Sequence, residues 1–373
     1  MASDLRLMLL MGPVLAVPVP APLADALQSV RVTTSSGRAS GFQLAFAVSA
    51  RSVVQRSLLP LGFFDPGIRV VLVAVVSGTP TVLADGIVTQ QELSPSAEPG
   101  AGVLTVTGED LSVLMDVRHE RECFPGLPHQ ARVVAICAKY AAYGIVPAAV
   151  PPVLADVPDP LEHIPVQAGT DLEYLRAMAS EVGHVFFLEP GPVPGSSLAY
   201  WGPEVRTGPV QPALTLGAGA AATAESLSFT YDGLSRTQYA VDVTEPVSKV
   251  RIGLPVPDVS LLHPPLAARP AVALKQEPVP DLGGRSVAEA LLLGLSRTAS
   301  SADAVRGNGR LDVLRYGHVL RARRLVGVRG AGPAYDGLYY VSSVTHDIRR
   351  GEYKQSFTLT RDGLGPLTPV VIP

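Results

Sequence analysis

The sequence has little charge and almost no cysteine. Charged residues make up 17% of the 373 positions, and 30 basic against 33 acidic residues leave a net charge of −3. A nucleic-acid-binding surface is therefore not expected, because such surfaces need an excess of lysine and arginine. Cys123 and Cys137 form no CxxC pair, so the sequence indicates neither a disulfide scaffold nor a zinc site. Two free thiols are expected.

Long hydrophobic runs and catalytic motifs are also missing. Residues 5–17 are apolar, but Asp4 precedes them and Pro13 interrupts them, so we expect an extended N-terminal strand and no signal peptide. No other run reaches the ~20 apolar residues of a membrane span. GxSxG, HExxH and GxxxxGK[ST] do not occur, and the GxGxxA-like residues 217–222 precede a predicted strand. We expect no cofactor, no metal and no membrane partner.

Glycine and proline are abundant instead, with 35 of each. In the first third of the chain, Phe42, Leu44 and Phe46 alternate with small or polar residues, which is the period of a half-buried strand. Thr105 and Thr107 alternate with apolar residues in the same way. Turn-forming residues separate these runs. The first third is therefore predicted to consist of strands.

A helical period follows in the middle of the chain. Residues 128–143 repeat apolar side chains at i, i+4 and i+7, which predicts that Cys137 packs in a core. Residues 171–182 follow Thr170, which forms a capping box with Glu173 and so predicts a second helix. A strand is expected after it, so this segment is α+β.

Strands return in the last third. They are predicted at residues 226–231, 238–243, 249–253, 317–328, 337–348 and 353–360, with a proline-rich arm or loop at about 254–285 and a helix that starts at a capping box of Ser286 and Glu289. The layout is thus β, then α+β, then β.

Some of the predicted strands carry candidate interface or lumen residues. Arg321 and Arg323 share one face of the predicted strand at residues 317–328, and this face could equally be a merely solvated one. Polar side chains also lie opposite the predicted core positions of other strands. The candidates are Thr105, Thr107, Arg321, Arg323, Lys354, Ser356 and Thr358.

Candidates for catalysis are few. His119 and Glu122 belong to a charged cluster that fits no zinc spacing, and a solvated face explains the cluster better. His346 is expected to be a hydrogen-bonded structural histidine beside Asp347. His119, Glu122 and His184 are the only loose candidates for an enzyme, and the lack of a converging set favours a structural or assembly role.

Three stretches resemble one known family. Residues 169–183 follow D-x-(E/D)-(F/Y)-L-x-x-(L/M)-A-x-E-x-G, residues 335–361 follow DG-x-Y-x-V-x-x-V-x-H and G-x-Y-x-x-x-F-x-L-x-R, and residues 26–46 are similar to the family's opening strands. The pattern resembles the phage late control protein D family, which includes baseplate hubs and the N-terminal hub part of VgrG spikes. The motif residues are Asp171, Glu173, Leu175, Gly183, Asp336, Gly337, Tyr339, His346, Tyr353 and Phe357.

The resemblance implies an α+β, mostly β fold. Two tube-type, β-barrel-like domains at residues 1–117 and 223–373 would flank an α+β domain at residues 118–222. The function implied is that of a non-enzymatic baseplate hub of a contractile phage tail or a related injection system. As a homotrimer, it would join the hexameric tail tube protein to a trimeric spike and contact other baseplate components. Such a protein is made in the cytoplasm and assembled into the particle.

The sequence leaves several alternatives open. Because the chain stops shortly after Gly365, without an OB domain or β-helix, the spike is expected to be a separate polypeptide. A β-rich hydrolase or a tail-associated wall-degrading enzyme is the alternative function. The residues do not distinguish a phage from a pyocin-like particle or an injection system.

Overall fold

The protein is described by a computed structural model that covers residues 5–37, 39–96, 102–152, 158, 160–161, 164–217, 219, 222–244, 251–256, 264–279 and 287–367. Strands dominate, as the sequence predicts. No helix in these ranges is both long and apolar enough to span a bilayer.

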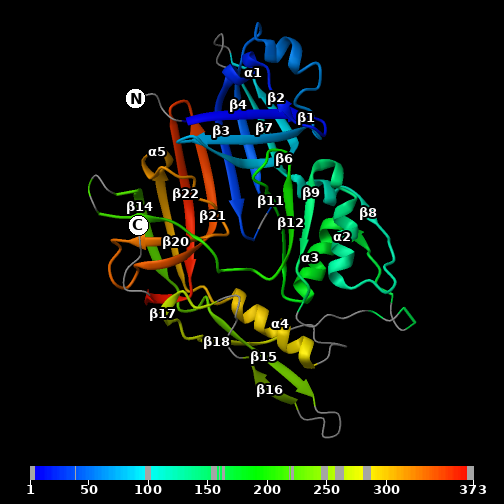
Figure 1. The fold of residues 1–373 in the computed structure, drawn as a ribbon, viewed down its shortest axis with the longest axis vertical. Helices are drawn as coiled ribbons and strands as arrows, with labels where there is room; N and C mark the ends of the chain where they lie inside the picture. The colour runs from blue at the N-terminus through cyan, green and yellow to red at the C-terminus, as the bar shows by residue number, and fades with distance from the viewer. Residues whose placement is uncertain are drawn as a thin grey trace.

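Most strands belong to a single sheet of 13 strands (Figure 1). They are β1 (Leu5–Gly12), β2 (Val17–Pro18), β3 (Leu27–Ser35), β4 (Gly41–Val48), β5 (Arg69–Val76), β6 (Thr79–Ser94), β7 (Gly102–Asp110), β13 (Val210–Thr215), β14 (Ala224–Tyr231), β19 (Val305–Asp312), β20 (Leu325–Arg329), β21 (Gly337–Arg349) and β22 (Glu352–Arg361). The strand order is β14-β19-β22-β21-β3-β4-β7-β6-β5-β1-β2, and β20 pairs with both β13 and β21.

The sheet joins two β units that are far apart in the sequence. The first unit comprises β1 to β7, and the second comprises β13, β14 and β19 to β22. They meet where β3 pairs with β21, from Ser29 opposite Arg349 to Ser35 opposite Ser343. Both units also contribute to one hydrophobic core. The two β units are therefore continuous in hydrogen bonding and in packing.

The predicted alternation along the strands is confirmed. Phe42, Leu44 and Phe46 in β4 are buried, and so are Phe357 and Leu359 in β22. The expected barrels are not closed, because the main path of paired strands runs from β14 to β2 without these two strands pairing in the described part of the chain. Alternation specifies which face of a strand is buried, but it does not specify whether the ends of a sheet meet.

A smaller α+β unit lies beside the sheet and is green in Figure 1. It contains β8 (His119–Glu120), α2 (His129–Ala138), β9 (Ile145–Ala149), β10 (Gly169–Thr170), α3 (Asp171–Glu181), β11 (Val185–Pro190), β12 (Ser197–Gly202) and the 3₁₀ turns at Leu111–Asp116 and Ala141–Tyr143. The sheet of this unit has the order β11-β12-β9. Its core surrounds Trp201 and includes Cys137, as predicted. Both cysteines are free.

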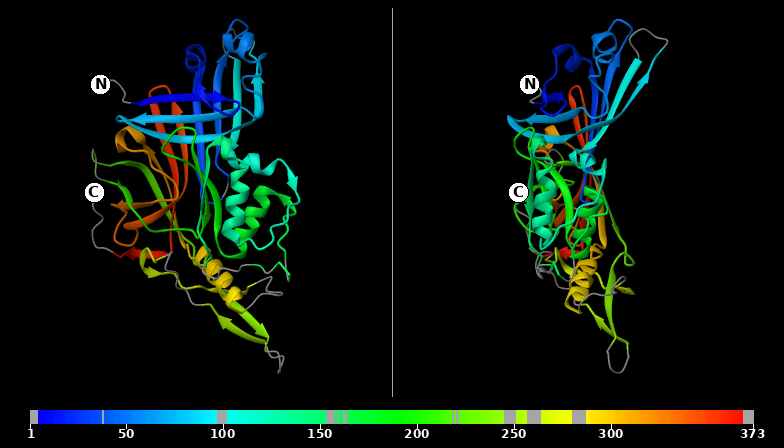
Figure 2. Two further views of the ribbon diagram at one scale, coloured as in Figure 1. Left: turned by 45° about the vertical axis from the view of Figure 1, so that its right-hand side comes forward. Right: turned by 90° about the vertical axis from the view of Figure 1, so that its right-hand side faces the viewer.

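A third group of elements extends below the sheet (Figures 1 and 2). It contains β15 (Thr237–Thr244), β16 (Arg251–Pro255), β17 (Ala267–Pro270), β18 (Lys275–Pro278), α4 (Val287–Ser300) and β23 (Gly363–Pro366). The described part of the proline-rich stretch pairs with other strands, since β17 lies against β23 and β18 against β15. The predicted capping box of α4 begins at Ser286, outside the described residues. The remaining helical elements are α1 (Ala21–Ala26), α5 (Val313–Tyr316) and a π-helix at Val54–Leu58.

The predicted strand at residues 317–328 is wrong over most of its length. Strand β20 begins only at Leu325, and residues 317–324 form a loop in which Arg323 has a φ of +61°. Leu320 and Ala322 are buried while Arg321 is exposed, so the loop imitates the alternation of a strand. The loop is held against β22 by Gln355, whose side-chain amide accepts from the Leu320 N–H and donates to the Leu320 carbonyl.

Candidate functional site

Six neighbouring strands, β19, β22, β21, β3, β4 and β7, present one polar surface. Residues opposite each other in antiparallel strands project to the same side of a sheet. The register pairs Lys354 with Asp347 and Asp347 with Arg31. It continues from Arg31 to Gln43 and from Gln43 to Thr107. We call this surface the polar face; it contains Arg31, Thr33, Gln43, Thr105, Thr107, Asn308, Arg310, Thr345, Asp347, Lys354, Ser356 and Thr358.

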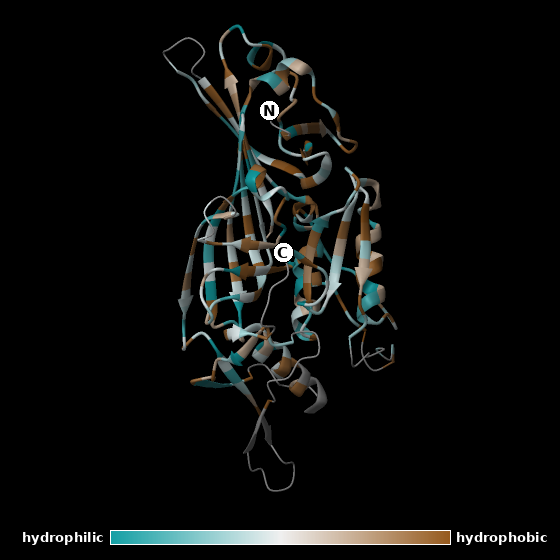
Figure 3. Cartoon of the chain, turned by 60° about the vertical axis from the view of Figure 1, so that its left-hand side comes forward, coloured by the Kyte–Doolittle hydropathy of each residue, from teal (hydrophilic) through white to brown (hydrophobic). Residues whose placement is uncertain are grey.

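Five of the seven predicted interface or lumen candidates lie together on the polar face: Thr105, Thr107, Lys354, Ser356 and Thr358. They come from both β units, so the face crosses the junction of β3 and β21. The alternation of hydrophilic and hydrophobic residues along these strands is visible in Figure 3. A role in an interface or a lumen remains a prediction for each of them.

Charges on the polar face are paired with each other or with neighbouring carboxylates. Arg31 Nε donates to Asp347 Oδ1 at 2.8 Å. Lys354 Nζ lies 3.1 Å from one carboxylate oxygen of Glu225 and 3.4 Å from Glu352 Oε1. The hydrogen bond to Glu225 raises the pKa of Lys354. Exposed pairs of this kind contribute little to stability, so their main effect is to lower the net charge of the surface.

The polar face is hollowed at the junction of the two β units. A depression of about 190 Å³ lies over β3, β4, β7 and β21, with Arg31, Gln43, Thr105 and Asp347 in its wall. Ala45 also lines it, and its small side chain leaves the space open. The hollow is therefore a feature of the joined sheet.

Arg321 and Arg323 lie elsewhere, in the loop before β20. The Arg323 guanidinium stacks over the Phe187 ring at 4.0 Å and donates to the Ser35 carbonyl at 2.6 Å. Phe187 belongs to the α+β unit and Ser35 to the first β unit. Arg323 thus connects three parts of the chain. The backbone of Arg321 is held by Gln211, whose side chain bonds to both its N–H and its carbonyl.

The first family motif forms a polar cluster in the α+β unit. Asp171 is 2% exposed and accepts from Gln167 Nε2 at 2.6 Å, Tyr140 Oη at 2.8 Å and Lys139 Nζ at 3.3 Å. Burial raises the pKa of the Tyr140 hydroxyl, and the bond to Asp171 raises it further. The three donated hydrogen bonds satisfy the oxygens of this buried carboxylate, which a buried polar group requires.

Other residues of this motif shape the helix that bears it. Thr170 and Glu173 form the predicted capping box, with the Glu173 N–H donating to Thr170 Oγ1 at 3.1 Å. The Leu175 carbonyl accepts from Trp201 Nε1 at 3.2 Å. Gly183 has a φ of +70°, and a Cβ there would meet the Ser296 side chain at 2.3 Å. Each of these motif positions therefore has a structural role, either in the cap of α3 or in its contacts with other elements.

The second motif contains the expected structural histidine. His346 Nδ1 lies 2.8 Å from the Tyr353 hydroxyl and 3.1 Å from Gln355 Nε2, all on the buried side of β21 and β22. Burial lowers the pKa of His346 to about 4. The imidazole is therefore neutral at pH 7.

The aspartate and glycine of the same motif surround a buried arginine. Arg361, with no exposed surface, donates to the carbonyls of Asp336, Ala334 and Gly363 at 2.8–2.9 Å. Its guanidinium stacks on the Tyr339 ring at 4.3 Å. Gly337 has a φ of +125°, and a Cβ there would lie 3.0 Å from Arg361 Nη1. The motif builds the turn that holds this arginine.

A buried ion pair that the sequence analysis missed connects the first β unit to the α+β unit. Arg69 Nε and Nη2 donate to the two carboxylate oxygens of Asp85 at 2.8 and 2.7 Å. Arg69 Nη2 also donates to the Gly195 carbonyl, and Ser197 Oγ donates to Asp85. In the sequence, Arg69 and Asp85 each appear as a single charged residue in an apolar run, which does not identify the partner of either.

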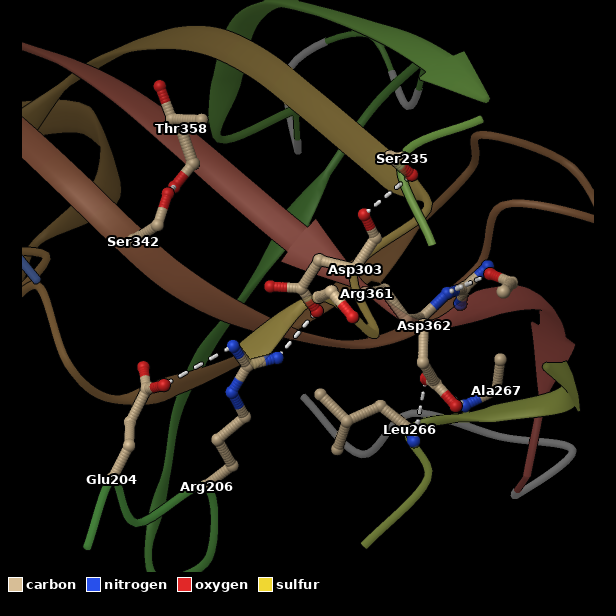
Figure 4. A network of polar contacts seen from close by, with 12 residues as sticks. Glu204, Arg206, Ser235, Leu266, Ala267, Asp303, Ser342, Thr358, Arg361 and Asp362 are labelled. Atoms are coloured by element: carbon tan, nitrogen blue, oxygen red, sulfur yellow. Dashed lines mark hydrogen bonds and ion pairs between the residues drawn. The ribbon is translucent and has the colours of Figure 1, made fainter. Parts of the chain in front are cut away.

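A second polar network lies between the α+β unit and the second β unit (Figure 4). Arg206 Nη1 lies 2.5 Å from Asp303 Oδ1, and Arg206 Nη2 lies 3.5 Å from Glu204 Oε2. Nearby, Asp362 Oδ1 accepts from two backbone N–H groups at the start of β17, at 2.9 and 3.0 Å. These contacts fix the connecting segments.

The three candidates for catalysis are not gathered in one site. Glu122 pairs with Lys139 at 2.9 Å, and His119 lies in β8. His184 packs against the Trp201 ring at 4.5 Å and lines a cavity to which neither of the other two contributes. Within the described ranges, no group of three metal-ligating side chains occurs.

Comparisons of sequence alone give no relative: no family model matches the chain, and no curated protein matches it. Solved structures do match. A tail protein of Neisseria meningitidis MC58 superposes with a TM-score of 0.62 at 14% identity, over 97% of this chain and 98% of that one. The 43 kDa tail protein of prophage MuSo2 from Shewanella oneidensis gives 0.64 at 12% identity, over 96% and 99%.

A third match is the E. coli c3393 protein, a component of the type VI secretion system that is described as similar to two T4 bacteriophage tail proteins. Its TM-score is 0.52 at 13% identity, over 93% of this chain and 77% of that one. At such identities the likeness concerns the fold, and the narrower late control protein D family remains a prediction. The chain therefore has the fold of phage tail proteins and of a type VI secretion component.

Proposed function

We propose that this chain is a structural baseplate hub of a contractile phage tail or of a phage-tail-like injection system. In this role it is a trimeric adaptor between the hexameric inner tube and a trimeric spike. The observation that carries the proposal is the polar face, which crosses both β units without interruption. The shared fold with phage tail proteins supports it.

The symmetry follows from two β units in one chain. Three copies supply six such units, so a trimer can match a ring of six tube subunits on one side and a threefold spike on the other. The polar face then lines the lumen. Its threonine, serine and paired charged side chains offer cargo neither apolar patches nor strong net charge. In this proposal the protein catalyses no reaction.

The partners follow from the same proposal. They are two further copies of this chain, the tail tube protein, a separate spike protein and other baseplate components. The protein is made in the cytoplasm and assembled into the particle. In this proposal the chain is a member of the late control protein D family, which its motif residues resemble.

Mass photometry tests the adaptor role. The chain has a mass of 39.0 kDa, so a complex with the spike should contain three copies, or 117 kDa of this protein. We expect this stoichiometry when the spike is present. A strict monomer with both spike and tube protein present would overturn the proposal, whereas a monomer of the isolated chain would show only that assembly needs its partners.

Bulky substitutions on the polar face test the lumen separately. Thr107→Trp and Ser356→Trp should leave the trimer intact and obstruct passage of cargo, because both side chains belong to the polar face. Arg118→Trp, at an exposed position outside the polar face, is the matched control. Unchanged delivery of cargo by assembled particles carrying both polar-face substitutions would place the face away from the lumen.

A further inference from the structure

The two β units share one topology. The strand order is β3-β4-β7-β6-β5 in the first unit and β14-β19-β22-β21-β20 in the second. The strands correspond one to one in chain order, and all of these neighbouring pairs are antiparallel. Each connection in the first unit therefore has a counterpart in the second, so the two ends of the sheet can be compared unit by unit.

The connections of the two units are alike at the end of the sheet where β4 and β19 finish, which we call the upper end (Figure 1). The two strands run in the same direction, because the path β19-β22-β21-β3-β4 contains four antiparallel steps. Each is followed by a connection that contains a short helical segment, the π-helix Val54–Leu58 before β5 and α5 before β20. Three copies of the chain would present six such connections.

The opposite end of the sheet, which we call the lower end, differs between the units. β3 and β4 are joined there by the short turn at residues 36–40, whereas the corresponding β14 and β19 are joined by residues 232–304. The longer connection contains β15 to β18 and α4, which belong to the third group at the bottom of Figure 1. This group occurs once in each chain. Three copies would therefore present three such groups, and the lower end has only threefold character.

The third group carries exposed apolar side chains at the lower end. Val272 and Leu274, between β17 and β18, are 76% and 68% exposed. Leu274 lies beside the turn that follows β14, because a Cβ at Gly233 would be 3.8 Å from Leu274 Cδ1. Leu234 in the same turn is 56% exposed. Apolar side chains that gather on a surface in this way are typical of protein–protein contacts.

The upper end is a basic surface. Arg56 in the π-helix and Arg315 in α5 belong to corresponding connections, and both are exposed. Arg56 Nε donates to the Ala50 carbonyl at 3.0 Å, and Arg315 Nη2 donates to the Gly219 carbonyl at 2.9 Å, so a main-chain contact orients each guanidinium. In a chain of net charge −3, the described segments at this end contain five arginines and three acidic residues; these segments are residues 21–26, 49–68, 313–318 and 349–352.

We propose that the upper end docks onto the six-subunit ring of the tail tube and that the lower end docks onto the spike. The inference rests on the proposed function and adds the polarity of the chain within the particle. Six similar connections match six equal subunits, whereas one third group per chain matches a threefold partner. In the contact with the tube, Arg56 and Arg315 alternate around the ring, and each pairs with a carboxylate of the tube protein.

Binding of the full chain to the purified tube and spike proteins of the same particle tests this polarity. Arg56→Glu/Arg315→Glu should bind assembled tube rings at least about tenfold more weakly than the wild type, because six charges are reversed in a trimer. Its binding to the spike should not change. Val272→Asp/Leu274→Asp should show the opposite pattern, since it places charge on an apolar contact surface.

The control is a charge reversal of the same size elsewhere. Arg118→Glu/Arg121→Glu changes two exposed arginines of the α+β unit and should alter neither interaction. Thermal melting establishes that each variant is folded. The single variants Arg56→Glu and Arg315→Glu should weaken tube binding to a similar extent, because each changes three of the six corresponding contacts in a trimer.

The outcomes separate this inference from the proposed function. Unchanged tube binding by Arg56→Glu/Arg315→Glu, or a loss of its spike binding instead, would overturn the polarity and leave the proposed function standing. Unchanged spike binding by Val272→Asp/Leu274→Asp would refute the contact at the lower end. A loss confined to one of the two single arginine variants would refute the six-point contact. If the wild type with bound spike fails to bind tube rings, the proposed function itself is refuted.

Discussion

We predict that the wild-type protein loses stability in acid through His346, and that the His346→Asn variant lacks this loss. His346 is 4% exposed, and its Nδ1 is within hydrogen-bond distance of Tyr353 and Gln355. Because Gln355 Nε2 can only donate, Nδ1 is an acceptor and the imidazole is neutral. Burial lowers the pKa of His346 from 6.5 to about 4; Asp347 acts in the opposite direction, and Arg321 lowers the pKa further.

The sign of the effect follows from proton uptake in the two states. Above pH 6.5 the imidazole is neutral in both states and contributes no pH dependence. As the pH falls from 6.5 towards 4, the unfolded chain binds a proton at this position and the folded chain does not. The free energy of unfolding therefore decreases over this interval. Since one pKa unit is worth about 1.4 kcal/mol, the total loss is about 3 kcal/mol.

Asparagine is the informative replacement because its Oδ1 can accept the same hydrogen bonds but does not titrate. Urea unfolding followed by circular dichroism, at several pH values through this interval, gives the free energy for both proteins. We expect the wild type to lose about 3 kcal/mol more than His346→Asn. Other groups, including His184, act on both proteins and cancel in the difference. Parallel pH dependences would refute the neutral, buried imidazole.

Four further substitutions test ion pairs, core packing and a helix cap. Asp85→Asn leaves the buried Arg69 without its partner and should lower the free energy of unfolding in urea by about 3–5 kcal/mol. Asp347→Asn breaks an exposed ion pair and should change the free energy of unfolding by less than about 1 kcal/mol. Similar losses in the Asp85→Asn and Asp347→Asn variants would contradict the difference in burial between the two pairs. Phe357→Ala removes a ring that is 3% exposed and should cost about 3–5 kcal/mol in thermal or urea unfolding; a loss under about 1 kcal/mol would take the ring out of the core. Thr170→Ala removes the capping box and should cost about 1 kcal/mol, with faster amide exchange in the first turn of α3, and unchanged exchange would count against the cap.

The parts of the fold that the sequence predicts are local ones. The alternation around Phe42 identifies a strand and its buried face because side chains alternate along any strand. The capping box of Thr170 and Glu173 identifies the start of α3 because both residues lie within one turn. The five polar-face candidates were found in the same way, as the residues opposite buried ones.

The missed parts depend on contacts between distant residues. Nothing in the sequence near Ser35 indicates that β3 pairs with β21, and this pairing turns two β units into one sheet. The loop at residues 317–324 resembles a strand in sequence because Leu320 and Ala322 are buried on either side of the exposed Arg321, while Gln355 holds the Leu320 backbone. Arg69 and Asp85 gave no signal of their pairing, since each is a single charge in an apolar run.

The junction of β3 and β21 also affects how the protein can fold. β3 ends at Ser35, and its partner strand ends only at Arg349. At a synthesis rate of ~5–20 residues per second, the edge of β3 stays without its partner for roughly 15–60 s on the ribosome. Contacts between such distant segments also form slowly in the released chain. The edge that later unites the two halves is therefore the place where newly made chains are most exposed to pairing with each other.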